Sequence, residues 1–238
     1  MPLDPKHHIK KVVCTSTITP RVSLMRKYIA IGIIIILAIV IILFVAPLKT
    51  IRIEIRDPLD DGTVYVLQEY LPDAIGYANG GLPGALIGNA VGGDHVVVSR
   101  GLYRFSLKGW KNQDITLHLY CLMKNATPEE LVIYVVNDFG ELPSEQIGDP
   151  HDVSDIWYLN VTGYRVGTVT PEVGRWFVVN IPGSIVFQYL TEDKYISFMV
   201  VLSNENSLYS HFGIATYEYA EEANIAKPYI TWKTPILP

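Results

Sequence analysis

The chain has 238 residues, a formal net charge of −5 at pH 7 and two cysteines. This acidic balance excludes a protein that holds nucleic acid on a broad basic face, because phosphates attract Lys and Arg side chains. Two cysteines are too few for a small fold held together by disulfides.

The N-terminal part divides into a basic tail and an apolar segment. Residues 1–27 form the basic tail; residues 1–24 show no hydrophobic periodicity, and Met25 begins a compact sequence that offers a second translation start. The apolar segment, residues 28–46, begins at Tyr28, ends at Ala46 and carries no charged or strongly polar side chain. As a helix they would extend roughly 28 Å, close to the thickness of the hydrocarbon core of a bilayer. We therefore predict a single transmembrane α-helix that contacts the lipid bilayer through residues 28–46.

The flanking charges predict the orientation of this segment. Lys and Arg outnumber acidic residues in residues 1–49, whereas acidic residues outnumber them in residues 50–238. Because cytoplasmic flanks carry the excess of Lys and Arg, we expect a single-pass protein of the cell membrane with a cytoplasmic N-terminus and an extracellular C-terminal domain. A translation start at Met25 would make the numbers of positive charges on the two flanks of the segment nearly equal. A cleaved signal peptide is the alternative, although its apolar region would be shorter.

The remaining sequence is typical of short β-strands. In residues 47–57 isoleucines alternate with charged residues, which predicts an extended linker or a first strand. Further runs rich in Val, Ile, Tyr and Phe predict strands at 63–70, 96–107, 115–123, 131–138, 175–181, 195–203, 211–219 and 228–232. We expect a long irregular loop in the glycine-rich residues 76–93 and one short helix at 184–190. Residues 58–238 are therefore predicted to form an all-β domain, an antiparallel β-sandwich of jelly-roll type.

The order of several motifs adds a resemblance to a known family. They are ALIGN at 85–89, SRGLYRFSL at 99–107, DITLHLYCL at 114–122, GTVTP at 167–171, RWFVVNIPGSI at 175–185 and ATYEYAEEANIAKPYITW at 215–232. In this order they resemble the DNRLRE, or disaggregatase-related, domain family, which is similar to β-sandwich carbohydrate-binding modules. The Asp-Val-Thr segment of the family is Asn180-Ile181-Pro182 here. The resemblance implies a non-catalytic binding or adhesion role at the cell surface, with sugar as the usual ligand class.

The sequence contains no recognisable catalytic set. None of the six histidines belongs to an HExxH motif, and Ser184 lacks the G-x-S-x-G context of a nucleophile elbow. We therefore predict a binding protein rather than an enzyme.

The tryptophans are the first candidates for ligand binding. Trp110 lies in a polar turn, where its ring could stack on a sugar, and Trp157 follows an acidic loop. Trp176 and Trp232 fall within strand patterns, so we expect them in the core.

Two arginines are further candidates. In SRGLYRFSL, Tyr103 and Phe105 fall on one side of the strand, whereas Arg100 and Arg104 share the other. Two interpretations stay open for the arginines: ion pairs with acidic residues of neighbouring strands, or recognition of a carboxylate or uronic acid by the guanidinium fork.

Acidic residues and sequons complete the candidates. Asp149, Asp152 and Asp155 are spaced three apart in a loop, so they either hold Ca²⁺ or are simply solvated. The sequons at Asn125 and Asn160 are glycosylation candidates if the domain is exported. A second acidic group contains Glu218, Glu221 and Glu222.

Together these features predict a membrane-anchored module that binds polysaccharide or a neighbouring surface protein. One alternative is a structural subunit of a surface layer or filament, assembled through exposed strand edges. Another is an accessory subunit of a membrane complex.

Overall fold

A computed structural model describes residues 27–37, 48–92, 95–125, 130–144, 149–206 and 209–236. Residues 27–37 are helical and belong to a separate N-terminal unit, whereas residues 48–235 form a compact unit of their own. No helix among the described residues is long and apolar enough to cross a membrane. Most of the predicted tail and residues 38–46 of the predicted membrane helix lie outside the described residues.

The compact unit consists mainly of strands. In the described part of the chain these are β1 (Leu48–Glu54), β2 (Asp61–Leu67), β3 (Ile75–Gly80), β4 (Ala85–Gly92), β5 (His95–Ser106), β6 (Ile115–Asn125), β7 (Leu131–Val136), β8 (His151–Asp152), β9 (Tyr164–Val169), β10 (Arg175–Ile181), β11 (Tyr195–Leu202), β12 (His211–Ile214) and β13 (Tyr229–Pro235). The helices are the 3-10 turns η1 (Pro58–Asp60) and η2 (Gln68–Asp73), and α2 (Ser154–Trp157), α3 (Leu159–Thr162), α4 (Gly183–Tyr189) and α5 (Tyr217–Ala223).

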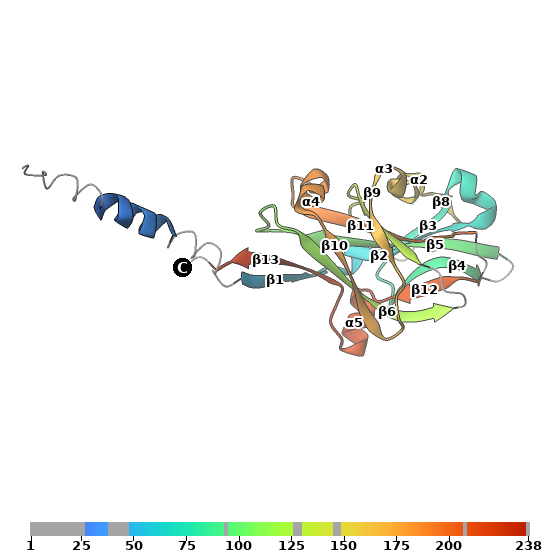
Figure 1. Ribbon diagram of the computed structural model, residues 1–238. Coiled ribbons are helices and arrows are strands. Elements are labelled where there is room, and N and C mark those ends of the chain that lie inside the picture. Colours follow the sequence, from blue (N-terminus) through green and yellow to red (C-terminus); the bar gives the residue numbers. More distant parts are fainter. Residues whose placement is uncertain are drawn as a thin grey trace, which may run out of the picture. The chain divides into compact units, whose positions relative to one another are not determined.

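All pairings between these strands are antiparallel, and the sheet curls into two layers (Figure 1). One layer contains β10, β6, β13, β1 and β12, and the other contains β3, β2, β5, β11, β7 and β9. Strand β4 pairs with β12 of the first layer and with β5 of the second, so it connects them. The predicted all-β class is confirmed.

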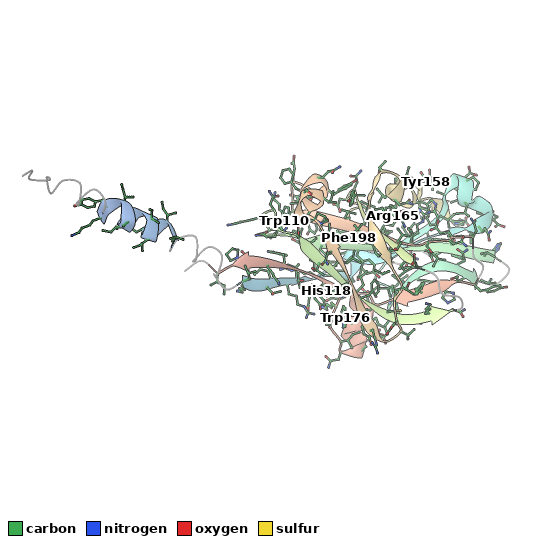
Figure 2. The ribbon with its side chains drawn as sticks, viewed as in Figure 1. Trp110, His118, Tyr158, Arg165, Trp176 and Phe198 are labelled. Atoms are coloured by element: carbon green, nitrogen blue, oxygen red, sulfur yellow. The ribbon has the colours of Figure 1, made fainter. Side chains whose placement is uncertain are left out.

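The larger core contains side chains from both layers. Leu117 and Leu119 of β6 contribute from one layer. Phe105 of β5 and Phe198 of β11 contribute from the other, and their ring centroids lie 5.9 Å apart. Phe198 is labelled in Figure 2. Trp232 is also buried in this core, as its strand pattern predicts. Period-two alternation therefore identifies the inward residues of these strands correctly.

A smaller core lies on the opposite face of β5, β11 and β7. Leu102, Met199 and Val132 belong to it, together with Trp157 of α2. Because side chains of these strands are buried on both faces, the segment around α2 must cover the second face.

Two expectations about secondary structure are wrong. The glycine-rich residues 76–93 form most of β3 and β4 rather than an irregular loop. Glycine permits close approach of backbones there: a Cβ atom on Gly88, which has φ +111°, would lie 2.3 Å from the Ser210 carbonyl oxygen. Residues 211–219 are not one strand either, because β12 ends at Ile214 and α5 begins at Tyr217.

Candidate functional site

A concave site lies around Trp110 at the end of β5. We call it the Trp110 pocket, a cavity of about 330 Å³. It is lined by Trp110, Lys111, Asn112, Phe187, Leu190 and Lys194. In Figure 2 the Trp110 label lies beside the ribbon of α4, which contributes Phe187.

Hydrogen bonds within the turn hold the Trp110 side chain. The Trp110 backbone N–H donates to the Leu107 carbonyl at 3.1 Å. The indole Nε1 donates to the Gln113 carbonyl at 2.8 Å, and the Gln113 side chain accepts from the Lys111 backbone N–H at 2.8 Å. The ring is therefore fixed by its own turn, with its indole donor already used. It is partly buried and packs against the larger core, and it also lines the pocket.

Helix α4 is docked closely against the same turn. The Gly183 backbone N–H donates to Asp114 Oδ1 at 2.8 Å. A Cβ atom at Gly183 would lie 2.3 Å from the Asn112 carbonyl oxygen, so this approach requires glycine. The helix places Phe187 at the pocket with 68% of the residue exposed. Trp110 and Phe187 thus both line this pocket with aromatic rings.

A second turn contributes Lys194. Its backbone N–H donates to the Thr191 carbonyl at 3.0 Å, and its carbonyl accepts from the Leu107 N–H at 2.6 Å. With Lys111, it places two basic residues at a pocket that also contains two aromatic rings. This combination suits a ring-shaped ligand that carries negative charge.

Arg100 lies in a nearly buried network. Its Nε and Nη2 donate to the two carboxylate oxygens of Glu205, each at 2.8 Å. Its Nη1 donates to Asn160 Oδ1 at 3.0 Å and also to the Trp157 carbonyl. The guanidinium carbon lies 3.7 Å from the centroid of the Trp157 ring.

Arg104 makes a comparable network with two carboxylates. Its Nε and Nη2 donate to Asp138 at 2.8 and 3.2 Å, and its Nη1 donates to Asp60 at 2.9 Å. The guanidinium also lies 3.6 Å from the centroid of the Tyr195 ring. Both arginines therefore form ion pairs, although their acidic partners lie in η1 and in the segments after β7 and β11 rather than within neighbouring strands. Binding of a ligand by either one stays a prediction.

Replacement of Asp138 by asparagine should destabilise the protein mainly near neutral pH. Burial alone would raise the pKa of Asp138, but hydrogen bonds from Arg104 and Ser197 outweigh it and hold the pKa below the ordinary value of 3.8. A carboxyl with a lower pKa in the folded state adds stability above its unfolded pKa, and this is lost as the pH falls through the folded pKa. Melting temperatures of wild type and Asp138→Asn should therefore differ most at neutral pH, and the difference should shrink only as the pH falls from about 4 through the lower folded pKa. A constant difference at every pH would contradict a role of the charge.

Trp157 is buried, with 2% of its surface exposed. One face of its ring is taken by Arg100, and the residue packs within the smaller core. The structure therefore gives Trp157 a packing role and separates it from the Trp110 pocket.

Sequence reasoning missed a group of aromatic residues on the outer side of β6, β10 and β13. We call it the aromatic face, formed by His118, Tyr120, Trp176 and Tyr229. The ring centroid of Trp176 lies 5.4 Å from that of Tyr120 and 5.1 Å from that of Tyr229, and the His118 ring stacks on Tyr229 with 4.2 Å between centroids. Figure 2 labels His118 and Trp176.

The expectation that Trp176 belongs to the core is wrong, because neither core contains it. The alternation within β10 could have revealed this. Val179 and Ile181 face the larger core, so Trp176 falls on the opposite side of the strand.

Calcium binding by the acidic loop at Asp149, Asp152 and Asp155 stays a prediction. Among the residues that the structure describes, no group of three or more His, Cys, Asp or Glu side chains could hold a metal ion. Asp152 instead accepts a hydrogen bond from the Ser154 N–H at 2.9 Å, and Asp155 accepts one from the Ile156 N–H at 2.9 Å. The two carboxylates thus bind the backbone of α2.

The two sequons lie in different surroundings. Asn125 is exposed at the end of β6. Asn160 lies in α3, where its side-chain oxygen accepts from Arg100. Glycosylation at either residue stays a prediction.

No protein-family model matches this chain, and no curated protein matches it. The resemblance to the DNRLRE family stays a prediction that rests on the motifs.

Proposed function

We propose that the domain is a non-catalytic polysaccharide-binding module and that the Trp110 pocket holds the sugar. The observation that carries this proposal is the pairing of Trp110 with the exposed Phe187 at one cavity of about 330 Å³. Flat aromatic surfaces stack on the apolar faces of pyranose rings. The hydrogen bonds of the Trp110 turn and the docking of α4 fix this arrangement before a ligand arrives, which lowers the entropic cost of binding.

The ligand that suits this pocket best is an acidic polysaccharide. Lys111 and Lys194 line it in a chain whose net charge is −5. A uronic acid or sulfated sugar would meet a local positive charge there and repulsion over much of the remaining surface.

The proposal places this module outside the cell on a membrane anchor. The apolar residues 28–46 and the excess of Lys and Arg before them support a cytoplasmic N-terminus and a displayed domain. The antiparallel curled sheet and the order of the motifs support a jelly-roll sandwich related to the DNRLRE domains.

The test measures binding of the full-length chain, purified in a mild detergent, to neutral and acidic polysaccharides. We expect binding to a polyuronate that weakens as salt is added, because exposed charges are screened. Phe187→Ala, a change at an exposed side chain, should weaken binding about tenfold or more with little effect on melting temperature. Lys194→Glu should weaken binding to the acidic polymer specifically.

Trp176→Ala is the matched aromatic control, because it removes a large ring from the aromatic face. It should leave binding unchanged. Loss of binding in Trp176→Ala but not in Phe187→Ala would indicate that the sugar binds the aromatic face rather than the Trp110 pocket. Absence of binding to every polysaccharide would contradict the proposed function.

A structural subunit of a surface layer is a second candidate, supported by the outer side of β10. Val178 is 50% exposed there and lies on the same side of the strand as Trp176. A second copy could cover these apolar side chains. Sedimentation of the full-length chain over a range of concentrations would then show assembly, and Val178→Asp would abolish it.

A further inference from the structure

Four buried oxygen atoms lie near the start of α5: Asp61 Oδ1, the Tyr103 hydroxyl oxygen and both carboxylate oxygens of Glu218. Among the described residues Asp61 Oδ1 and the Tyr103 hydroxyl have no hydrogen-bond partner, whereas the Glu218 carboxylate has only its own backbone N–H and the Thr216 hydroxyl within reach. We call Asp61, Tyr103 and Glu218 the buried oxygen cluster. A buried polar atom without a partner costs free energy, so native proteins usually supply one.

The fold brings these residues to one place. Asp61 of β2 is paired with Tyr103 of β5, so the two side chains share one face of the sheet. Both residues are fully buried. Asp61 Oδ2 accepts a hydrogen bond from the Tyr217 N–H at 2.9 Å, and the next residue, Glu218, is near enough for its charge to act on Asp61. Thr216 donates its one hydroxyl proton to a backbone carbonyl rather than to Glu218.

The charge of the two carboxylates has little compensation from basic side chains. Lys227 is near enough to act on Asp61, but its ammonium pairs with Glu221 and lies 3.7 Å from the centroid of the Tyr217 ring. Two carboxylates brought together away from water therefore lack a positive charge at Asp61 Oδ1, which is fully buried and unpartnered among the described residues.

We propose that the buried oxygen cluster binds one Ca²⁺ ion through Asp61 Oδ1 and the carboxylate oxygens of Glu218. Two carboxylates balance the charge of a divalent ion. Ca²⁺ accepts six to eight oxygen ligands in flexible geometry, so neutral oxygens such as the Tyr103 hydroxyl and water can complete its shell. Mg²⁺ is less suitable because it demands octahedral geometry and keeps several waters. The ion ties β2 and β5 to α5.

The test uses the full-length chain in a mild detergent after removal of metal ions with a chelator. Calorimetric titration with CaCl₂ should give about one site per chain. A Ca²⁺ concentration about a hundredfold above Kd should raise the melting temperature by roughly 5–10 °C. Asp61→Asn and Glu218→Gln should each abolish the binding heat and this rise, and MgCl₂ should produce a smaller rise in the wild type.

Asp152→Asn and Asp155→Asn are the matched controls, because they neutralise exposed carboxylates of the loop at 149–155. Both variants should keep the full response to Ca²⁺. Absence of binding heat in the wild type would overturn the proposal. A response that persists in Asp61→Asn and disappears in Asp155→Asn would overturn it as well, since calcium would then bind the loop. If Asp61→Asn fails to fold, the titration of the wild type and of Glu218→Gln still tests whether Ca²⁺ binds the buried oxygen cluster.

Discussion

Replacement of Arg104 by alanine is expected to lower the free energy of unfolding by about 3–5 kcal/mol. The side chain of Arg104 is only 11% exposed, and it pairs with Asp60 and Asp138, which are 10% and 21% exposed. Removal of the guanidinium leaves two shielded carboxylates without their shared cation. The cost of such an uncompensated charge exceeds the modest value of a surface pair. Chemical denaturation of the full-length chain, followed by circular dichroism, measures the change.

The matched control is Arg175→Ala. Arg175 pairs with Glu172 at 3.2 Å, but the two side chains are 74% and 70% exposed. Solvent screens this pair, so its loss should cost less than about 1 kcal/mol. Arg104→Lys should fall between the two, because a lysine keeps the charge and lacks the planar fork. Equal effects of Arg104→Ala and Arg175→Ala would show that burial does not strengthen the Arg104 network.

Replacement of Trp157 by alanine is expected to cost about 3–5 kcal/mol, the usual effect of removing a large buried ring. Trp157 packs in the smaller core, and its ring covers the guanidinium of Arg100 at 3.7 Å. The substitution therefore opens a cavity and removes a cation–π contact. Circular dichroism during denaturation measures the loss, since this substitution also removes one of the tryptophan fluorophores.

The same variant separates packing from ligand binding. Trp157→Phe keeps an aromatic ring and should retain much of the stability. Both Trp157 variants should bind polysaccharide like the wild type at temperatures where they are folded. Near-normal stability of Trp157→Ala together with weaker polysaccharide binding would contradict the packing role and restore Trp157 as a binding residue.

The candidate site was only partly predictable from the sequence. Trp110 could be chosen because its polar turn places it outside the strand pattern. Its partner Phe187 could not, because α4 is distant in sequence and reaches the turn through Gly183 and Asp114. The aromatic face escaped notice because its members come from three strands whose neighbours were unknown.

The sequence by itself determined the all-β class and the inward side of most strands, because alternation along a strand is a local property. Only the tertiary structure decided what covers each outward side. Arg100 pairs with Glu205, 105 residues away, and Asp61 contacts Tyr217, 156 residues away. The glycine-rich β3 and β4 also depend on their neighbours, since glycine has little preference for a strand until a close backbone approach requires it. Contacts between residues so distant along the chain produce no periodic pattern in the sequence. The ion pairs and the buried oxygen cluster therefore form only when the curled sheet brings these residues together.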